Sequence, residues 1–537
     1  MHPASTCFGV ALRGHGIPLQ SRKSVTDLLA TKRLEALMDE ARHQGETDLK
    51  RVLGPLNLVT LGIGAIIGAG IFVLTGTVAA NFAGPAIVLS FIFAGIGCFF
   101  AGLCYAEFAS LIPVAGSAYT YAYATLGEIF AWIIGWDLII EYAFGDAVVA
   151  AGWSGNLVAL LQSFGIQIPP QLIATPGTLL VFYAGKWSPL ATVQPLLDHA
   201  GIRPETLPHA HGIMDLPAYL VTALITMILV LGIRESANVN SAIVIIKVGT
   251  VLTFIFVAAA FLLQHPSVAA AHWRPFIPPN LGKFGQFGWS GVARGAGVIF
   301  FAYIGFDAVS TAAQEARNPQ RDMPIGILGS LAICTVLYVA LGAMLTGVVS
   351  YTQLNTAAPV ALGIEATGAS WGSTLVMLGT FAGLTSAMLV MLLGQSRVQY
   401  SMSRDGLLPP WAGRVHPRFR TPWISTIVVG FFVALLGSLL PINVLSELTS
   451  IGTLLAFAIV SAGVWILRVR RPDLPRPFKA PLVPLVPILG MGIPLILMLS
   501  LSRATWLRLI VWLIIGMAIY LGYGRTHSRL ARGMGKG

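Results

Sequence analysis

Runs of mostly apolar residues alternate with short polar connections along almost the whole chain. A helix needs about 20 apolar residues to cross the hydrocarbon core of a bilayer, and twelve runs are long enough to do so. They lie at 57–80, 84–112, 128–161, 215–233, 239–263, 293–313, 325–349, 372–399, 423–440, 444–467, 482–501 and 505–523. The pattern therefore predicts an all-α integral membrane protein with twelve transmembrane helices.

One further apolar stretch, 173–184, is too short to span a membrane, and Pro176 and Gly177 interrupt it. Proline and glycine break helical patterns. We therefore expect this stretch to lie in an external loop, 162–214, between the third and fourth spans.

Positive charges are distributed unevenly over the predicted connections. With the N-terminus inside, 25 of the 33 Lys and Arg residues fall in inside segments and 7 in outside loops. Inside loops of membrane proteins carry an excess of Lys and Arg. The asymmetry predicts that the terminal segments 1–56 and 524–537 are both cytoplasmic, in a cell (inner) membrane protein. It also explains the net charge of +11 without a nucleic-acid partner.

The first predicted span contains no charge and an unusual number of glycines for a helix. Each glycine in a helix interior costs about 1 kcal/mol relative to alanine. Glycines can allow close helix packing, as Gly64 and Gly68 would. Alternatively the helix is broken and its bare backbone meets a ligand, since unwound backbone in a membrane is tolerated only inside protein or beside water. The glycines are Gly62, Gly64, Gly68, Gly70 and Gly76.

The sixth predicted span carries a second interruption, with Gly305 and Asp307 near its centre. Two broken helices five spans apart and in opposite orientation are expected for inverted repeats that bind substrate near the membrane midplane. Close helix packing could explain one interrupted helix, but it explains a pair of interruptions five spans apart less well. We therefore favour a binding site. The predicted repeats are 57–263 and 293–467, followed by two more helices within 482–523.

Composition supports a membrane protein and excludes several classes of function. Only 10% of the residues are charged, against about 25% in soluble domains. Cys98, Cys104 and Cys334 lie inside apolar runs, so no disulfide framework is expected. The chain has no phosphate-binding loop of the Gly-x-x-x-x-Gly-Lys-Ser/Thr type, so nothing indicates that ATP hydrolysis drives it.

Lys247 and four acids lie in apolar surroundings well inside predicted spans, away from the span ends. Such residues are functional candidates by default, with structural ion pairs as the alternative. Lys247 lies a third to half way across the fifth span. Snorkelling to the surface is the alternative, but that surface is about two turns away. A lysine at this depth can release a proton, because burial disfavours its charged form. Asp137 and Glu141 are four residues apart and share a helix face; the remaining acids are Asp146 and Asp307.

Six stretches are similar to one known family. They are Gly-Ile-Gly-Ala-Ile-Ile-Gly-Ala-Gly-Ile-Phe at 62–72, Tyr-Ala-Glu-Phe-Ala-Ser-Leu-Ile-Pro-Val-Ala-Gly-Ser-Ala-Tyr at 105–119, Gly-Ile-Arg-Glu-Ser-Ala-Asn-Val-Asn at 232–240, Phe-Phe-Ala-Tyr-Ile-Gly-Phe-Asp at 300–307, Asn-Pro-Gln-Arg-Asp-Met-Pro-Ile-Gly-Ile at 318–327 and Ser-Arg-Asp-Gly-Leu-Leu-Pro at 403–409. The chain resembles the amino acid–polyamine–organocation superfamily, and within it the bacterial branch of the cationic amino acid transporter family.

The resemblance implies a LeuT-type fold of five plus five helices with two more at the end. It further implies proton-coupled uptake of an amino acid, either cationic or small and neutral, without a cofactor. The protein would act in the lipid bilayer as a monomer or with a small accessory membrane subunit.

The resemblance also implies a substrate site at the two breaks. Free N–H groups at the N-terminal end of a half-helix suit a carboxylate, and unwound carbonyls suit an ammonium group. The implied carboxylate-binding backbone is that of Ile66, Gly68, Ala69 and Gly70. The implied ammonium-binding carbonyls are those of Phe301, Ala302 and Ile304, with Phe301, Tyr303 and Phe306 lining the cavity. Many relatives carry a hydroxyl residue where Ala69 stands, and core packing is the alternative for Tyr303 and Phe306.

Three charged residues are implied in proton coupling. The ammonium group of Lys247 would occupy the place of a sodium ion in sodium-coupled relatives. Glu141 would face the substrate region and couple to Lys247, while Asp307 would brace the second break. Thr385 and Ser386 could supply sodium ligands, although a neighbouring cation would oppose the metal.

Other charges near the ends of spans are expected to have structural roles. Glu107 would anchor the inner gate or the fold. The cytoplasmic groups are interpreted as loop structure and topology signals; they are Arg317, Arg321 and Asp322, and Arg404 with Asp405.

These observations predict a secondary active transporter that takes up amino acids by proton symport with alternating access. An exchanger of amino acids or polyamines and a sodium-coupled symporter are alternatives of the same fold. A membrane enzyme or channel is a further alternative. The spans contain no histidine cluster, cysteine-rich motif or nucleophile–base group, so we expect no catalysis.

Overall fold

The computed structural model describes residues 30–32, 53–114, 116–231, 237–313, 316–356, 358–419, 421–530 and 532. Most of the predicted N-terminal segment, the end of the C-terminal tail and the start of the motif at 232–240 lie outside the described residues.

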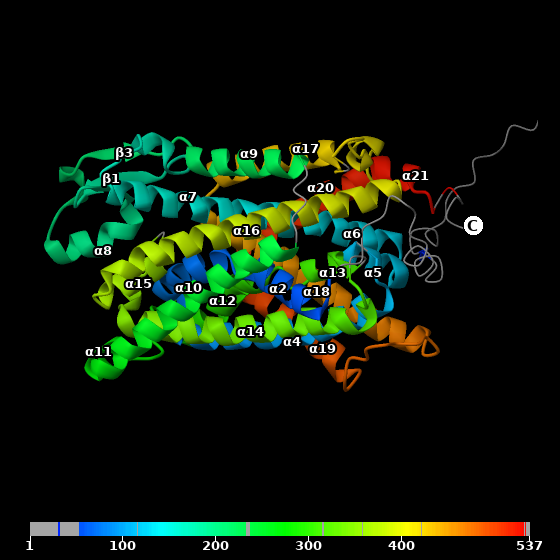
Figure 1. The fold of residues 1–537 in the computed structure, drawn as a ribbon, viewed down its shortest axis with the longest axis horizontal. Coiled ribbons are helices and arrows are strands. Elements are labelled where there is room, and N and C mark those ends of the chain that lie inside the picture. The colour runs from blue at the N-terminus through cyan, green and yellow to red at the C-terminus, as the bar shows by residue number, and fades with distance from the viewer. Residues whose placement is uncertain are drawn as a thin grey trace, which may run out of the picture.

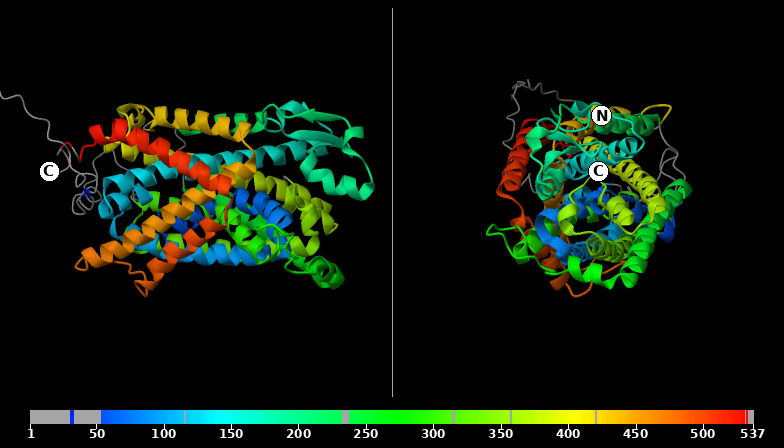
Figure 2. Two further views of the ribbon diagram at one scale, coloured as in Figure 1. Left: turned by 180° about the vertical axis from the view of Figure 1, so that it is seen from behind. Right: turned by 90° about the vertical axis from the view of Figure 1, so that its left-hand side faces the viewer.

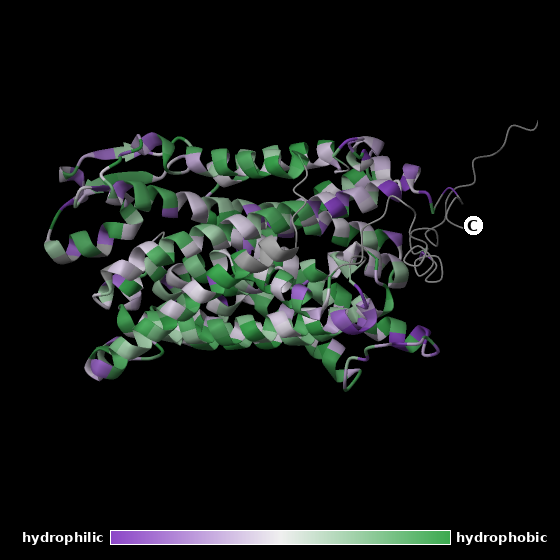
Figure 3. Ribbon diagram, viewed as in Figure 1, coloured by the Kyte–Doolittle hydropathy of each residue, from purple (hydrophilic) through white to green (hydrophobic). Residues whose placement is uncertain are grey.

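Helices dominate the described chain and run side by side in an elongated bundle (Figure 1). The end-on view in Figure 2 shows them packed around one another in a rounded cross-section. Hydrophobic residues prevail in the central part of the bundle, and hydrophilic residues gather toward its two ends (Figure 3). This distribution is that expected of a protein whose middle faces lipid.

Seven helices in the described part of the chain are long and apolar enough to cross a membrane. They are Gly70–Leu111, Ile243–Gln264, Gly288–Thr311, Pro319–Val348, Trp371–Arg404, Ile442–Arg470 and Arg503–His527. Four shorter apolar helices accompany them: Pro55–Ile66, Leu216–Leu231, Trp423–Leu439 and Leu485–Ser500. The prediction of a multi-pass helical membrane protein is thereby confirmed, while the count of twelve spans stays a prediction.

The helices outside the two interrupted spans are α5 (Ser117–Thr125), α6 (Glu128–Ile139), η5 (Ile140–Phe144), α7 (Gly145–Ser163), η6 (Pro170–Leu172), α8 (Leu190–Ala200), η7 (Pro204–Thr206), α9 (Leu216–Leu231), α10 (Ala237–Gln264), α11 (Pro266–His272), α14 (Pro319–Val348), η10 (Tyr351–Gln353), α15 (Pro359–Ala366), α16 (Ser370–Arg404), η11 (Pro410–Gly413), α17 (Trp423–Leu439), α18 (Ile442–Arg470), α19 (Leu485–Ser500), α20 (Arg503–Ile519), η12 (Tyr520–Gly524) and α21 (Arg525–His527). Several of these helices are longer than the apolar runs that predicted them, because their first or last turns contain polar residues.

The first interruption is present where the glycines predict it. Helix α2 (Pro55–Ile66) ends inside the bundle, and the π-helix η2 (Gly70–Leu74) begins after three intervening residues. A π-turn inside a helix often marks a functional position. The chain continues through α3 (Thr75–Val78), η3 (Ala79–Ala83) and η4 (Gly84–Ala86) into α4 (Ile87–Leu111).

The second interruption follows α12 (Gly288–Ile299), which tightens into the 3-10 turn η8 (Phe300–Tyr303) before α13 (Ala308–Thr311) begins. Gly305 lies between them with φ of +116°, a conformation that residues with a side chain rarely adopt. A Cβ atom at this position would also lie 2.8 Å from the carbonyl carbon of Ala65. Glycine is therefore required here by both conformation and space.

The two interruptions touch each other through their backbones. A Cβ atom added to Gly70 would overlap the Cα of Ala302, and Gly305 lies against Ala65 in α2. Close packing and helix breaking, the two interpretations of the glycines, thus occur together. The glycines let both broken segments meet in the middle of the bundle.

The segment between α7 and α9 contains a small antiparallel sheet that the sequence analysis did not predict. Its strands β1 (Leu179–Tyr183), β2 (Lys186–Pro189) and β3 (His209–His211) have the order β2-β1-β3. Ala184 and Gly185 turn the chain between β1 and β2 with positive φ angles. The stretch 173–184 is therefore no span, as expected, but it contributes a strand because its apolar residues cover α8.

Both terminal segments pack at the same end of the bundle. Lys32 Nζ donates to Asp405 Oδ1 at 3.2 Å, and the Arg529 backbone N–H donates to the Asp405 carbonyl at 3.0 Å. Glu128, at the start of α6, accepts hydrogen bonds from Tyr520 and Ser528. This placement agrees with two termini on one side of a membrane.

We expect Gly70→Ala to lower the free energy of unfolding by about 1–3 kcal/mol, because the added methyl group must displace the backbone of Ala302. Thermal denaturation of the purified protein measures the change. Gly492→Ala is the matched control, because no atom lies within 4 Å of the added Cβ there. Equal melting temperatures for the two variants would contradict the packing argument.

Candidate functional site

The carbonyl end of α2 is capped by a buried lysine. Lys247, on α10, is fully buried, and its Nζ donates to the carbonyls of Gly64 at 2.5 Å and Ile67 at 3.0 Å. A third hydrogen bond, of 2.9 Å, goes to Ser386 Oγ on α16. The last carbonyls of a helix lack intrahelical partners and carry partial negative charge. The ammonium group therefore satisfies α2 exactly where the chain unwinds, and snorkelling is excluded.

A tyrosine that the sequence analysis missed connects the two interruptions. The Tyr338 hydroxyl, from α14, lies 2.8 Å from both the Ile66 and the Ala302 carbonyl oxygens. One side chain thus holds the end of α2 and the middle of η8 together. Its hydroxyl was no distinctive signal, because the predicted span 325–349 also contains Ser330, Thr335 and Thr346. Tyr338 is completely buried.

Asp307 braces the second interruption, as predicted. Its Oδ1 accepts the backbone N–H of Gly305 at 3.2 Å, and its Oδ2 accepts the Tyr142 hydroxyl at 2.6 Å. Tyr142 belongs to η5, a π-turn in the third predicted span. The brace therefore ties the turn at Gly305 to a different helix, and Tyr142 is a second residue that sequence reasoning missed.

Glu141 lies beside Asp307, and both carboxyl groups are fully buried. Neither oxygen of Glu141 has a hydrogen-bond partner among the described residues, and the same holds for Asp137 and Asp146. Neighbouring buried carboxylates repel each other unless a proton or a cation lies with them. The cluster is thus suited to hold positive charge.

The lysine and the acids form two separate centres. The Lys247 ammonium group contacts Gly64, Ile67 and Ser386, and no ion pair joins it to Glu141 or Asp307 in the described part of the chain. The structure brings Glu141 to Asp307 and leaves Lys247 on the other interruption. The expected coupling between Glu141 and Lys247 is not a direct contact.

The residues predicted to bind the substrate backbone all lie at the two interruptions. Ile66 closes α2, and Gly68, Ala69 and Gly70 lead into η2. The residues Phe301, Ala302, Tyr303, Ile304 and Phe306 form η8 and the turn that follows. All are buried. Their roles in binding stay predictions.

The aromatic residues of the second interruption have specific neighbours. The Tyr303 hydroxyl donates to the Phe91 carbonyl at 2.8 Å, so this side chain packs toward α4. Phe306 packs against Phe457, with 4.8 Å between ring centroids. The Phe301 ring lies close to Gly145 at the start of α7. Core packing thus accounts for the contacts of Tyr303 and Phe306, while the Phe301 ring lies against the third predicted span.

The described residues offer no evident metal site. No group of three or more His, Cys, Asp or Glu side chains there is arranged to hold a metal ion. Ser386, a possible sodium ligand, accepts a hydrogen bond from Lys247 instead. The cation at the end of α2 is the lysine itself.

A family model described as amino acid permease matches residues 53–520, which include both interruptions and Lys247. The chain belongs to the amino acid permease family. The resemblance to the amino acid–polyamine–organocation superfamily is confirmed, and the protein is a permease, not an enzyme.

The relatives of this permease carry different named substrates. It is 44% identical to the branched-chain amino acid permease BcaP of Bacillus subtilis, over 95% of this chain and 98% of that protein. It is 40% identical to the methylthioribose transporter of the same organism, over 94% and 100%. The vacuolar cationic amino acid transporter 4 of Arabidopsis thaliana is 35% identical over 80% of this chain and 66% of its own length.

We expect Tyr338→Phe to lower the transport rate about tenfold, because it removes a hydroxyl that joins both interruptions and a hydrogen bond contributes about 1 kcal/mol or more. Uptake of labelled substrate by vesicles measures the change. Tyr520→Phe is the control: it removes a hydroxyl bonded to Glu128 at the far end of the bundle. A transport rate in Tyr338→Phe equal to that in the control would contradict this role.

Proposed function

We propose that this permease takes up an amino acid by proton symport, with Lys247 as the residue that carries the proton. One observation carries the proposal: a buried lysine ammonium group caps the end of α2 at the first interruption, and it has no acidic partner among the described residues. Because the Lys247 ammonium group donates to the last carbonyls of α2, its protonation acts directly on the end of the broken helix.

The hydrogen bonds of Lys247 suggest how the proton affects conformation. A charged lysine has three N–H donors and no acceptor, and all three are used on Gly64, Ile67 and Ser386. The neutral amine has two donors and a lone pair, so it can keep both carbonyls of α2 only by giving up its donation to Ser386, whose hydroxyl already donates to the Gly383 carbonyl. Release would therefore weaken the link that Lys247 makes between α2 and α16, which would let the first broken helix move during alternating access.

The acid pair Glu141 and Asp307 is proposed as the second proton-coupling element. Asp307 holds the turn at Gly305, and Glu141 lies beside it with both oxygens unpartnered. A change in protonation of the pair would alter the repulsion between the two carboxyl groups. A change in protonation of Glu141 and Asp307 would thereby alter the conformation of the second interruption, as proton release from Lys247 would alter that of the first.

The substrate is proposed to bind between the interruptions. Its carboxylate would meet the backbone N–H groups of Ile66, Gly68, Ala69 and Gly70, and its ammonium group the carbonyls of Phe301, Ala302 and Ile304. Apolar groups surround this region: the Ala69 and Val73 side chains approach Gly152, and Met391 and Phe301 approach Gly145. These surroundings favour an apolar substrate side chain, which agrees with the name of the BcaP relatives.

A cationic substrate is the second candidate. The unpartnered oxygens of Glu141 and Asp137 support it, as does the similarity to the Arabidopsis cationic transporters. The proposed setting is a LeuT-type fold with twelve spans in the cell (inner) membrane and both termini in the cytoplasm.

We expect Lys247→Ala to keep substrate binding and to lose proton-driven accumulation. Proteoliposomes with an imposed pH gradient measure accumulation, and a thermal-shift titration with the same amino acid measures binding, since a ligand of the folded state raises the melting temperature. The control is Lys186→Ala, an exposed lysine on β2. Accumulation in Lys247→Ala equal to that in the control would overturn the proton role.

The same proteoliposomes distinguish the two alternatives. Uptake that requires internal amino acid and ignores the pH gradient identifies an exchanger. Uptake that stops when sodium is replaced, and persists in Lys247→Ala, identifies a sodium-coupled symporter. We expect no sodium dependence, because Lys247 already bonds to the end of α2 and to Ser386.

A further inference from the structure

A cavity of about 680 Å³ opens on the surface of the bundle, away from the two interruptions. It lies between the first turns of α14 and the connection 471–484 that joins α18 to α19. Its walls are formed by Asn318, Gln320, Arg321, Pro324, Ile325, Leu328, Gly329, Pro477 and Phe478.

The lining of the cavity changes from polar to apolar along α14. The polar members lie at the start of the helix, and Arg321 is exposed. Ile325 and Leu328 follow one and two turns later, about 6 Å and 10 Å further along the helix axis. Ile325 is 41% exposed. A ligand that fills this cavity would meet a cation and amides at one end and a hydrocarbon surface at the other.

Positive charge prevails at the polar end. Arg321 forms no ion pair with an acid in the described part of the chain. The nearest acid on the helix, Asp322, is buried, and its Oδ2 accepts the backbone N–H of Asn318 at 3.2 Å. Lys479 directly follows Phe478 and is exposed. The cavity therefore offers an anion a charged partner that is not already neutralised.

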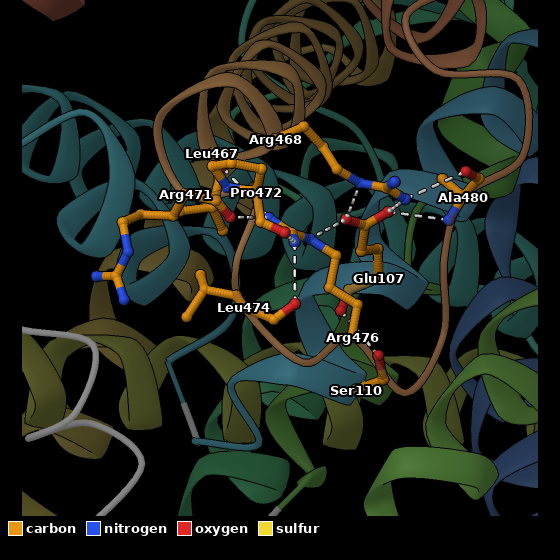
Figure 4. A network of polar contacts seen from close by, with 9 residues as sticks. All are labelled: Glu107, Ser110, Leu467, Arg468, Arg471, Pro472, Leu474, Arg476 and Ala480. Carbon is orange, nitrogen blue, oxygen red and sulfur yellow. Dashed lines mark hydrogen bonds and ion pairs between the residues drawn. The ribbon is translucent and has the colours of Figure 1, made fainter.

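The opposite wall is fixed by a network around Glu107 of α4 (Figure 4). Arg468 donates to both Glu107 oxygens, at 2.8 and 2.7 Å, in a bidentate pair. Arg476 lies 3.2 Å from the same carboxylate, and the Ala480 backbone N–H donates to it at 2.9 Å. The expected anchoring role of Glu107 is thus confirmed for the fold.

Arg476 also holds the connection from within. Its two terminal nitrogens donate to carbonyls on both sides of the turn, with 2.7 Å to Arg471 and 3.1 Å to Leu474. The guanidinium group is almost fully buried, with 3% of the side chain exposed. Pro477 and Phe478 follow directly in the chain. The wall of the cavity is therefore positioned by a buried, multiply bonded arginine.

We propose that this cavity binds an anionic phospholipid, with the phosphate at Arg321, Gln320 and Asn318 and an acyl chain along Ile325, Leu328 and Phe478. A phospholipid has a charged headgroup next to hydrocarbon chains, which is the same order of polar and apolar groups as along the cavity wall. Phospholipids are present in every membrane that contains a permease. Basic residues near a membrane surface attract anionic lipids. The proposal uses the membrane location of the family and does not depend on proton coupling.

The test is a lipid titration of the purified protein in neutral detergent, with melting temperature as the readout. We expect phosphatidylglycerol to raise the melting temperature and phosphatidylcholine to raise it much less. Arg321→Ala should weaken the apparent affinity for phosphatidylglycerol about fivefold, the factor that corresponds to about 1 kcal/mol per basic residue near anionic lipid. Ile325→Ser, which keeps the charge, should weaken the affinity for both lipids.

The control variant is Arg414→Ala, which removes an exposed arginine from the connection between α16 and α17 and changes the net charge equally. Its affinity for phosphatidylglycerol should match that of the unmodified protein. Equal affinities for Arg321→Ala and Arg414→Ala would overturn the proposal. So would a full effect from soluble glycerol phosphate, which would show a free phosphate site without a lipid chain. Unchanged amino acid uptake in Lys247→Ala would refute proton coupling and leave this result untouched.

Discussion

The contact between a lysine ammonium group and the end of a broken helix supports the centre of this permease. A helix that stops inside a membrane leaves carbonyls without partners, and no water is present in hydrocarbon to replace them. Lys247 from α10 and Tyr338 from α14 supply those partners to α2. Without them the carbonyls at the end of α2 would be buried unsatisfied, which is costly in a membrane interior.

The two interruptions depend on each other in the same way. Tyr338 contacts the carbonyls of both, and Gly70 and Gly305 allow their backbones to meet. Positive charge lies at the first interruption and buried acids at the second. No ion pair connects these centres within the described residues. The contacts that join the two interruptions are those of the Tyr338 hydroxyl and of the backbones that meet at Gly70 and Gly305.

The sequence was informative where a residue is out of place in its surroundings. Glycines in an uncharged run predicted the first interruption, and a lysine in the middle of an apolar run predicted a buried cation. Asp307 was expected to brace the second break, and it does so through Gly305.

Residues that resemble ordinary core could not be recognised in this way. Tyr338 and Tyr142 are typical of buried aromatic positions, and only the fold shows what their hydroxyl groups reach. The partners of Glu107 were equally hidden, because Arg468 lies 361 residues away in the chain. The small sheet was missed because its strands are short and its third strand is distant from the first two.

The small sheet and α8 form a unit with a hydrophobic core of its own. Val181, Val193 and Leu197 make a cluster separate from the main core of the bundle. Local openings of a protein follow such units, and each opens with its own free energy. Amide hydrogens of β1 can therefore exchange with solvent while α2 and α10 stay closed. Because its core is separate from that of the bundle, we expect a change inside this unit to disturb the membrane part less than a change in α2 or α10.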